Sequence, residues 1–90
     1  MKKIKIGDFV VGDNRKFVLI AGPCVLENEK AATDVALYLK KLTAKLKMPF
    51  IFKASYDKAN RTSINSYRGP GYEKGLDILQ NIREKLNIPV

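Results

Sequence analysis

Two different spacings of apolar residues along the chain predict both strands and helices. In residues 1–16, Ile4 and Ile6 alternate with lysines and a second apolar run follows a Gly-Asp pair, which is the pattern of a short β-hairpin. Residues 17–21 are continuously apolar, as in a parallel strand that is buried on both faces. The chain is therefore expected to open with a hairpin and then enter a buried strand.

A second buried strand is predicted at residues 50–55. Side chains alternate across a strand, so the two phenylalanines share one face while Ile51, Lys53 and Ser55 share the other. We expect the phenylalanine face to pack on helices. The opposite face becomes polar toward the C-terminal end of the strand.

Two amphipathic helices are predicted from apolar residues that recur three or four positions apart. The first begins at Asn28, which can cap its N-terminus, and ends before Pro49. The second ends at Asn87, a residue that tolerates the left-handed conformation of a helix C-terminus. The expected core-facing stripes are Ala31, Val35, Leu39, Leu42 and Leu46 in the first helix, and Tyr72, Leu76, Leu79, Ile82 and Leu86 in the second.

The order of these elements predicts an α/β fold. Strand, helix, strand and helix in succession imply parallel strands joined by right-handed crossovers, and residues 88–90 would begin a third strand. Two strands and two helices leave open sheet edges and little core. We therefore interpret residues 1–90 as the opening part of one larger domain, with 1–16 as its hairpin and 17–90 as two strand-helix units. Functional groups are expected at the C-terminal ends of the strands.

Composition limits where the protein is expected to be found and what it is expected to bind. The chain has 90 residues, one cysteine and a formal net charge of +8. It cannot form an internal disulfide, its start does not resemble a secretory signal, and no apolar run is long enough to span a bilayer. We expect a soluble cytoplasmic protein with no membrane partner. The lysines are dispersed and no nucleic-acid-binding signature occurs, which favours a phosphorylated small molecule over nucleic acid.

Candidate binding residues gather at the end of the second strand and in the polar loop that follows it. Cations and hydroxyl or amide donors in so small a volume suit phosphate and carboxylate oxygens. The alternative, a solvated basic surface loop, stays open at this point. The residues concerned are Lys53, Ser55, Lys58, Asn60, Arg61 and Thr62.

A single cysteine lies just past the first strand, where Cys24 follows Gly22 and Pro23. Glycine allows close backbone approach and proline ends the strand ladder, so the cysteine is presented at the C-terminal end of the strand. Cys24 is a candidate metal ligand. The alternative is a small buried hydrophobic residue.

Three strings of sequence resemble one enzyme family. They are Ala-Gly-Pro-Cys at 21–24, Phe-Lys-Ala-Ser-Tyr-Asp-Lys-Ala-Asn-Arg at 52–61 and Ser-Tyr-Arg-Gly-Pro-Gly at 66–71. Together they closely resemble 3-deoxy-D-manno-octulosonate 8-phosphate synthase, over nearly the whole chain. The resemblance implies a (β/α)₈ TIM barrel, to which these residues would contribute the N-terminal hairpin and the first two strand-helix units.

The resemblance also implies an activity and a set of site residues. Members of the family condense phosphoenolpyruvate with D-arabinose 5-phosphate and water and release phosphate, in lipopolysaccharide precursor synthesis. By this resemblance Lys53 and Lys58 are catalytic and bind phosphoenolpyruvate, with Ser55 beside them. The segment that holds arabinose 5-phosphate corresponds to Asn60, Arg61 and Thr62.

Cys24 resembles the metal-dependent members, in which the cysteine after Gly-Pro binds a divalent ion such as manganese, iron or zinc. The other ligands, a histidine and two carboxylates, would come from later strands, and this sequence contains no histidine. We therefore expect the 90 residues alone to be an inactive truncated fragment, and the complete enzyme to be a homotetramer. The nearest alternative is the related 3-deoxy-D-arabino-heptulosonate 7-phosphate synthase, which is expected to carry Lys-Pro-Arg-Thr in place of the Lys-Ala-Asn-Arg at 58–61.

Overall fold

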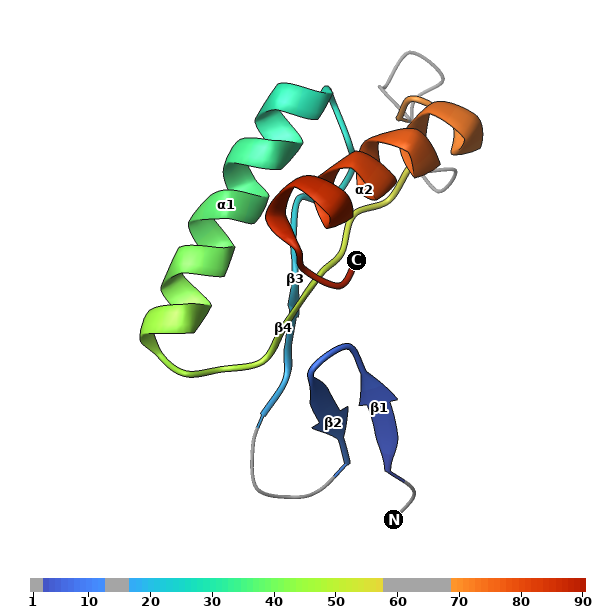
Figure 1. Cartoon of the computed structure of the whole chain (residues 1–90). Helices are drawn as coiled ribbons and strands as arrows, with labels where there is room; N and C mark the ends of the chain where they lie inside the picture. The colour runs from blue at the N-terminus through green and yellow to red at the C-terminus, as the bar shows by residue number, and fades with distance from the viewer. Residues whose placement is uncertain (1–2, 13–16, 58–68) are drawn as a thin grey trace.

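The computed structural model describes residues 3–12, 17–57 and 69–90 and has a mixed α/β architecture (Figure 1). Its described part contains two helices and two small sheets of two strands each. The elements in chain order are β1 (Ile4–Ile6), β2 (Phe9–Val11), β3 (Leu19–Ala21), α1 (Glu29–Lys45), β4 (Phe50–Phe52) and α2 (Tyr72–Leu86).

The predicted N-terminal hairpin is confirmed. Strands β1 and β2 pair antiparallel, with Ile4 opposite Val11 and Ile6 opposite Phe9. The turn between them uses Gly7 at a φ of 54°, a left-handed conformation that glycine adopts without steric cost.

The second sheet is parallel, as the strand-helix order predicts. Leu19 pairs with Phe50 and Ala21 pairs with Phe52. Both strands are shorter than the predicted 17–21 and 50–55, although an isolated parallel bridge between Val25 and Ser55 continues the pairing beyond them. The C-terminal ends of β3 and β4 therefore stay side by side.

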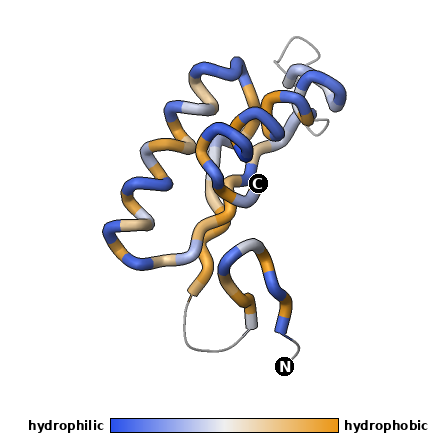
Figure 2. Tube along the Cα trace, viewed as in Figure 1, coloured by the Kyte–Doolittle hydropathy of each residue, from blue (hydrophilic) through white to orange (hydrophobic). Residues whose placement is uncertain are grey.

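Both helices contribute to the core on one face of the parallel sheet, where Phe52 is fully buried and Phe50 nearly so. This confirms the prediction that the phenylalanine face packs on helices. Figure 2 shows apolar residues along β3 and β4 and mixed apolar and polar turns on the helices. The buried cluster consists of Leu26, Ala32, Ala36, Phe50, Phe52, Ile78, Ile82 and Ile88.

The prediction that residues 17–21 are buried on both faces is wrong for the described part of the chain. Ile20 is 61% exposed and Phe17 is 87% exposed. For Ile20 the physical reason is that α1 and α2 pack on the face that carries Leu19 and Ala21, and no described element covers the opposite face. Phe17 precedes the paired part of β3 and is not packed against the core cluster.

Helix α1 begins as predicted but buries a different stripe. The Oδ1 atom of Asn28 accepts a hydrogen bond from the Ala31 backbone N–H at 2.7 Å, so the predicted cap is confirmed. The buried residues are Ala32, Ala36 and Thr43, with Leu39 packed beside them. Small alanines let the helix axis approach the sheet closely, which turns most of the predicted stripe outward. The exposed members are Ala31, Val35, Leu42 and Leu46.

Helix α2 keeps most of its predicted stripe, since Ile82 is buried and Leu79 and Leu86 are partly buried against the core. Gly75, Ile78 and Ile82 are buried, whereas Tyr72 and Leu76 from the predicted stripe are exposed. The predicted left-handed stop is confirmed, since the C-terminal cap residue Asn87 has a φ of 54°. Among the residues that the structure describes, neither helix is long and apolar enough to cross a bilayer.

Two polar contacts join the two helices. The Nζ atom of Lys40 in α1 donates a partly buried hydrogen bond of 2.5 Å to the backbone oxygen of Leu86 in α2. The Nδ2 atom of Asn81 donates to Oε1 of Glu29 at 3.1 Å. These contacts fix α2 against α1 along its C-terminal half.

Residues 88–90 lie against the second edge of β4 without being assigned as a strand. The Phe52 backbone N–H donates to the Pro89 carbonyl at 2.9 Å, and Ile88 is buried. The predicted third strand is thus represented by a single backbone hydrogen bond. Figure 1 shows the C-terminus beside β4, on the side of the hairpin.

Candidate functional site

The candidate site lies at the C-terminal ends of β3 and β4. The Lys53 backbone N–H donates to the Ala21 carbonyl at 3.0 Å, and the Leu26 backbone N–H donates to the Ser55 carbonyl at 2.9 Å. Cys24 lies between these two attachment points in the sequence. The structure therefore brings the backbone around Cys24 next to the backbone of Lys53 and Ser55.

Glycine is required where the two strand ends meet. A Cβ atom added to Gly22 would lie 2.9 Å from the Lys53 carbonyl carbon and closer still to the carbonyl oxygen. No larger residue fits here without moving one of the two strand ends. Gly22 thus holds the turn before Cys24 directly against Lys53.

The side chains at these positions differ in exposure. Lys53 is exposed, next to the fully buried Phe52, and Ser55 is half-buried. Cys24 is an exposed free thiol, so the alternative of a small buried hydrophobic residue is wrong. An ammonium group, a hydroxyl group and a thiol are therefore presented by adjacent segments at one end of the sheet.

The described residues do not form a complete metal site. No group of three or more His, Cys, Asp or Glu side chains lies close enough to hold an ion in residues 3–12, 17–57 and 69–90. Thiolate is a suitable ligand for zinc or iron, but Cys24 alone cannot satisfy either ion.

Four of the predicted binding residues are not among those that the structure describes. Lys58, Asn60, Arg61 and Thr62 lie outside the described residues, and their roles stay predictions.

The described residues on the two sides of this stretch meet at Tyr56. The Tyr56 carbonyl accepts a hydrogen bond of 3.1 Å from the Gly71 backbone N–H. A Cβ atom added to Gly69 would lie 2.8 Å from the Tyr56 carbonyl carbon and 3.0 Å from Cγ2 of Val25. Sequence reasoning missed this role of Tyr56. A signal for it was Gly75, a glycine inside the second helical pattern, which lies against Tyr56.

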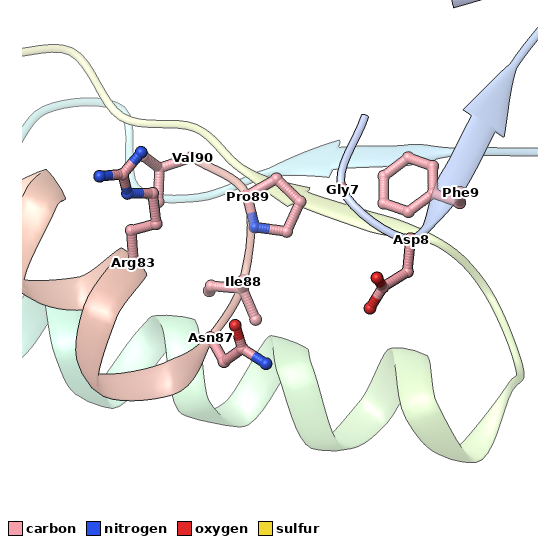
Figure 3. Close-up of a pocket in the computed structure, with 8 residues that line it drawn as sticks. All are labelled: Gly7, Asp8, Phe9, Arg83, Asn87, Ile88, Pro89 and Val90. Carbon is pink, nitrogen blue, oxygen red and sulfur yellow. The ribbon is translucent and has the colours of Figure 1, made fainter. Parts of the chain in front are cut away.

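Two cavities of comparable size lie near the strands. One of about 470 Å³ separates the hairpin turn from the end of α2, and its lining includes none of Cys24, Lys53 and Ser55. Figure 3 shows Asp8 and Phe9 on one side of it and Asn87 and Ile88 on the other. The other, of about 510 Å³, lies beside the turn that precedes Cys24 and is mostly apolar. Its lining residues are Ala21, Gly22, Pro23, Asp34, Val35, Tyr38 and Leu39.

Comparison with known proteins identifies the family. Residues 1–90 match the DAHP synthetase I family along their whole length. The chain belongs to the DAHP synthetase I family. Among curated relatives, the chain is 51% identical over 90 residues to the 2-dehydro-3-deoxyphosphooctonate aldolase of Fusobacterium nucleatum, which covers 100% of the chain and 32% of the relative.

Two further curated relatives carry the same name as the Fusobacterium nucleatum protein. Identity to the Paracidovorax citrulli protein is 60% over 87 residues, covering 97% of the chain and 30% of the relative. Identity to the Geotalea daltonii protein is 52% over 90 residues, covering 100% of the chain and 33% of the relative. The chain thus spans about a third of the length of these curated relatives.

Proposed function

We propose that these 90 residues form the N-terminal part of a 2-dehydro-3-deoxyphosphooctonate aldolase, which condenses phosphoenolpyruvate with D-arabinose 5-phosphate and water. The observation that carries the proposal is the placement of Lys53, Ser55 and Cys24 at adjacent C-terminal strand ends. Three relatives that bear this enzyme name match nearly the whole chain at 51%, 60% and 52% identity, which supports the same activity here.

The proposed architecture is a TIM barrel, of which the parallel β3–β4 pair would be the first two strands. The hydrogen bond from Phe52 to Pro89 supports a third strand on the free edge of β4. Both helices contribute to the core on the same face of the sheet, as they do on the outside of a barrel. The opposite face, with Ile20 and Lys53, would then line the barrel interior.

The reaction requires the neutralisation of two phosphates and a carboxylate. We propose that the Lys53 ammonium binds an anionic group of phosphoenolpyruvate while the Ser55 hydroxyl donates a hydrogen bond beside it. Lys58 is proposed as a second catalytic cation, and Asn60, Arg61 and Thr62 as the arabinose 5-phosphate segment.

In the chemical step, C3 of phosphoenolpyruvate forms a bond to the aldehyde carbon of the sugar, whose oxygen takes a proton. Water adds at C2, where positive charge develops, and the phosphate group then leaves from C2 to give the keto product. Fixed cations near the phosphate stabilise the charge that the departing group carries. Lys53 is suited to this role because it is presented at the strand end with a backbone held by β3.

For the metal, the described residues fit only in part. Cys24 would supply one sulfur ligand to a divalent ion such as manganese, iron or zinc, and the remaining ligands would have to come from elsewhere in the protein. When bound, such an ion would polarise the sugar aldehyde or orient water. We derive no step through it. A homotetramer in the cytoplasm is proposed from the resemblance alone.

The related 3-deoxy-D-arabino-heptulosonate 7-phosphate synthase reaction is the second candidate, because the family description itself names DAHP synthetase. The two reactions share phosphoenolpyruvate and differ in the sugar, so the consumed sugar distinguishes them. Lys-Ala-Asn-Arg at 58–61 favours arabinose 5-phosphate.

The test is phosphate release from phosphoenolpyruvate by the protein that contains these 90 residues, with either arabinose 5-phosphate or erythrose 4-phosphate as acceptor. We expect release with the arabinose compound. Replacing Lys53 by Ala should lower kcat/KM by roughly 10- to 100-fold, the loss typical of one charge-assisted contact. Lys41→Ala, at an exposed lysine of α1, is the matched control and should leave kcat/KM unchanged. Release with erythrose 4-phosphate alone would contradict the proposal.

A further inference from the structure

The chain that leaves β4 is attached to the first turns of α2 through Tyr56. The ring of Tyr56 lies 6.4 Å from the ring of Tyr72 between centroids, at an interplanar angle of 55°. The Tyr56 carbonyl accepts from the Gly71 N–H at the N-terminal cap of α2. We call this set of interactions the Tyr56–α2 contact, and it also includes the approach of Tyr56 to Gly75.

Gly75 permits that approach. A Cβ atom added to Gly75 would lie 3.2 Å from Cγ and 3.5 Å from Cα of Tyr56, and closer still to Cβ of Tyr56. Glycine within a helix is normally less stable than alanine, so its presence in the buried face of α2 has a cost. The close packing of Tyr56 accounts for the glycine, since no other residue leaves room for it.

The contact acts on the candidate site through the backbone. Tyr56 directly follows Ser55, whose carbonyl accepts from Leu26, and Lys53 is bonded to Ala21. The end of β4 is therefore held by β3 on one side, while the Tyr56–α2 contact holds the residue that follows it. We therefore expect that loss of this second attachment leaves the strand pairing intact and lets Ser55 and Lys53 shift.

We propose that Tyr56 is a positioning residue, which acts through its contact with Gly75 to fix Lys53 and Ser55 for binding of phosphoenolpyruvate. The inference rests on the proposed function of the site. It assigns no catalytic role to the Tyr56 ring. It goes further by naming the interaction that sets the geometry of the strand end.

The experiment measures two quantities on the protein that contains these residues: the thermal midpoint, and the Kd of phosphoenolpyruvate well below that midpoint. The variants are Gly75→Ala, Tyr56→Gly, their combination, and Tyr56→Phe as the conservative variant. Glu73→Ala, at an exposed residue of the same helix, is the matched control. Helix propensity alone predicts that Gly75→Ala raises the midpoint.

If the contact acts as proposed, Gly75→Ala lowers the thermal midpoint. It also weakens phosphoenolpyruvate binding by about 10-fold, the change in Kd expected when one contact is lost. In the Tyr56→Gly background the same substitution raises the midpoint, because the obstructing Cβ is gone. Tyr56→Phe keeps the ring and the carbonyl and should bind as the unsubstituted protein does. If Gly75→Ala does not fold, the Kd values of Tyr56→Gly and Tyr56→Phe for phosphoenolpyruvate are compared instead. Weaker binding by Tyr56→Gly than by Tyr56→Phe then supports the inference.

Two results overturn the inference while leaving the proposed function standing. One is a raised midpoint for Gly75→Ala in the unsubstituted background. The other is a lowered midpoint with an unchanged Kd, which would make the contact structural only. Absence of phosphoenolpyruvate binding by the unsubstituted protein would instead overturn the proposed function and the inference with it, and is recognised before any variant is compared.

Discussion

Gly22 lies directly against the backbone of Lys53, so that a methyl group at position 22 would overlap the Lys53 carbonyl. This relationship joins the two sequence features that carry the functional argument, the turn before Cys24 and the lysine at the end of β4. The hydrogen bond from the Lys53 N–H to Ala21 lies immediately beside it. The packing of these two residues sets the spacing of the strand ends.

Gly22→Ala is therefore expected to destabilise the protein. Backbone atoms cannot yield as a flexible side chain does, so the strand ends must separate, with a loss of about 1–3 kcal/mol as in other overpacked positions. Urea unfolding followed by circular dichroism measures the change. Cys24→Ala, at the exposed neighbouring residue, is the control and should alter stability by less than about 0.5 kcal/mol. Equal stability of Gly22→Ala and the unsubstituted protein would show that the two backbones are not in contact.

The cap of α1 gives a second prediction. Asn28→Ala removes the acceptor of the Ala31 N–H and should lower the free energy of unfolding by about 1 kcal/mol. Asn28→Asp keeps an acceptor and adds a negative charge at the N-terminus of the helix, where charge of that sign is favourable. Thermal unfolding should rank Asn28→Asp close to the unsubstituted protein and Asn28→Ala below it. The opposite order would contradict the cap.

The contact between the helices is tested at Lys40. Lys40→Met keeps the apolar stem but removes the donor to the Leu86 carbonyl, and should cost about 1 kcal/mol. Lys41→Met makes the same change at an exposed neighbour and should be nearly neutral. Chemical denaturation measures the free energy of unfolding of both variants. A matching effect at the two positions would mean that the hydrogen bond contributes nothing specific.

Cys24 gives a prediction about reactivity. Because its side chain is exposed, the thiol should react with a thiol reagent under native conditions at a rate close to that of the unfolded chain. If Cys24 is a ligand in the complete protein, added zinc, iron or manganese should slow that reaction there, and a chelator should restore it. Protection of Cys24 without metal would contradict the exposed position, and indifference to all three metals would contradict the proposed ligand role.

The features that sequence alone predicted correctly are those set by local chemistry or by strand-helix order. Asn28 and Asn87 mark helix ends because the cap and the left-handed stop depend on a few neighbouring residues. The parallel pairing that joins β3 and β4 follows from the helix between them. The same topology places Cys24 and Lys53 at one end of the sheet.

The features that sequence missed depend on distances between elements. In α1, Val35 and Ala36 lie on neighbouring stripes, and only the close approach of the helix to the sheet selects the alanine side. The packing of Tyr56 on Gly75 joins residues from β4's extension and α2, and no periodicity encodes it. Ile20 was expected to be buried because apolar runs usually are, yet the described elements cover only the opposite face.

The most direct test of the account is a titration, with phosphoenolpyruvate, of the isotope-labelled protein that contains these 90 residues, followed by backbone amide chemical shifts. The account predicts saturable changes at Lys53, Ser55 and the amides around Cys24, which disappear in Lys53→Ala and persist in Lys41→Ala. Changes centred on the lysines of α1, or at Arg83 beside the hairpin cavity, that survive Lys53→Ala would contradict it. In that case the ends of β3 and β4 are not the binding site.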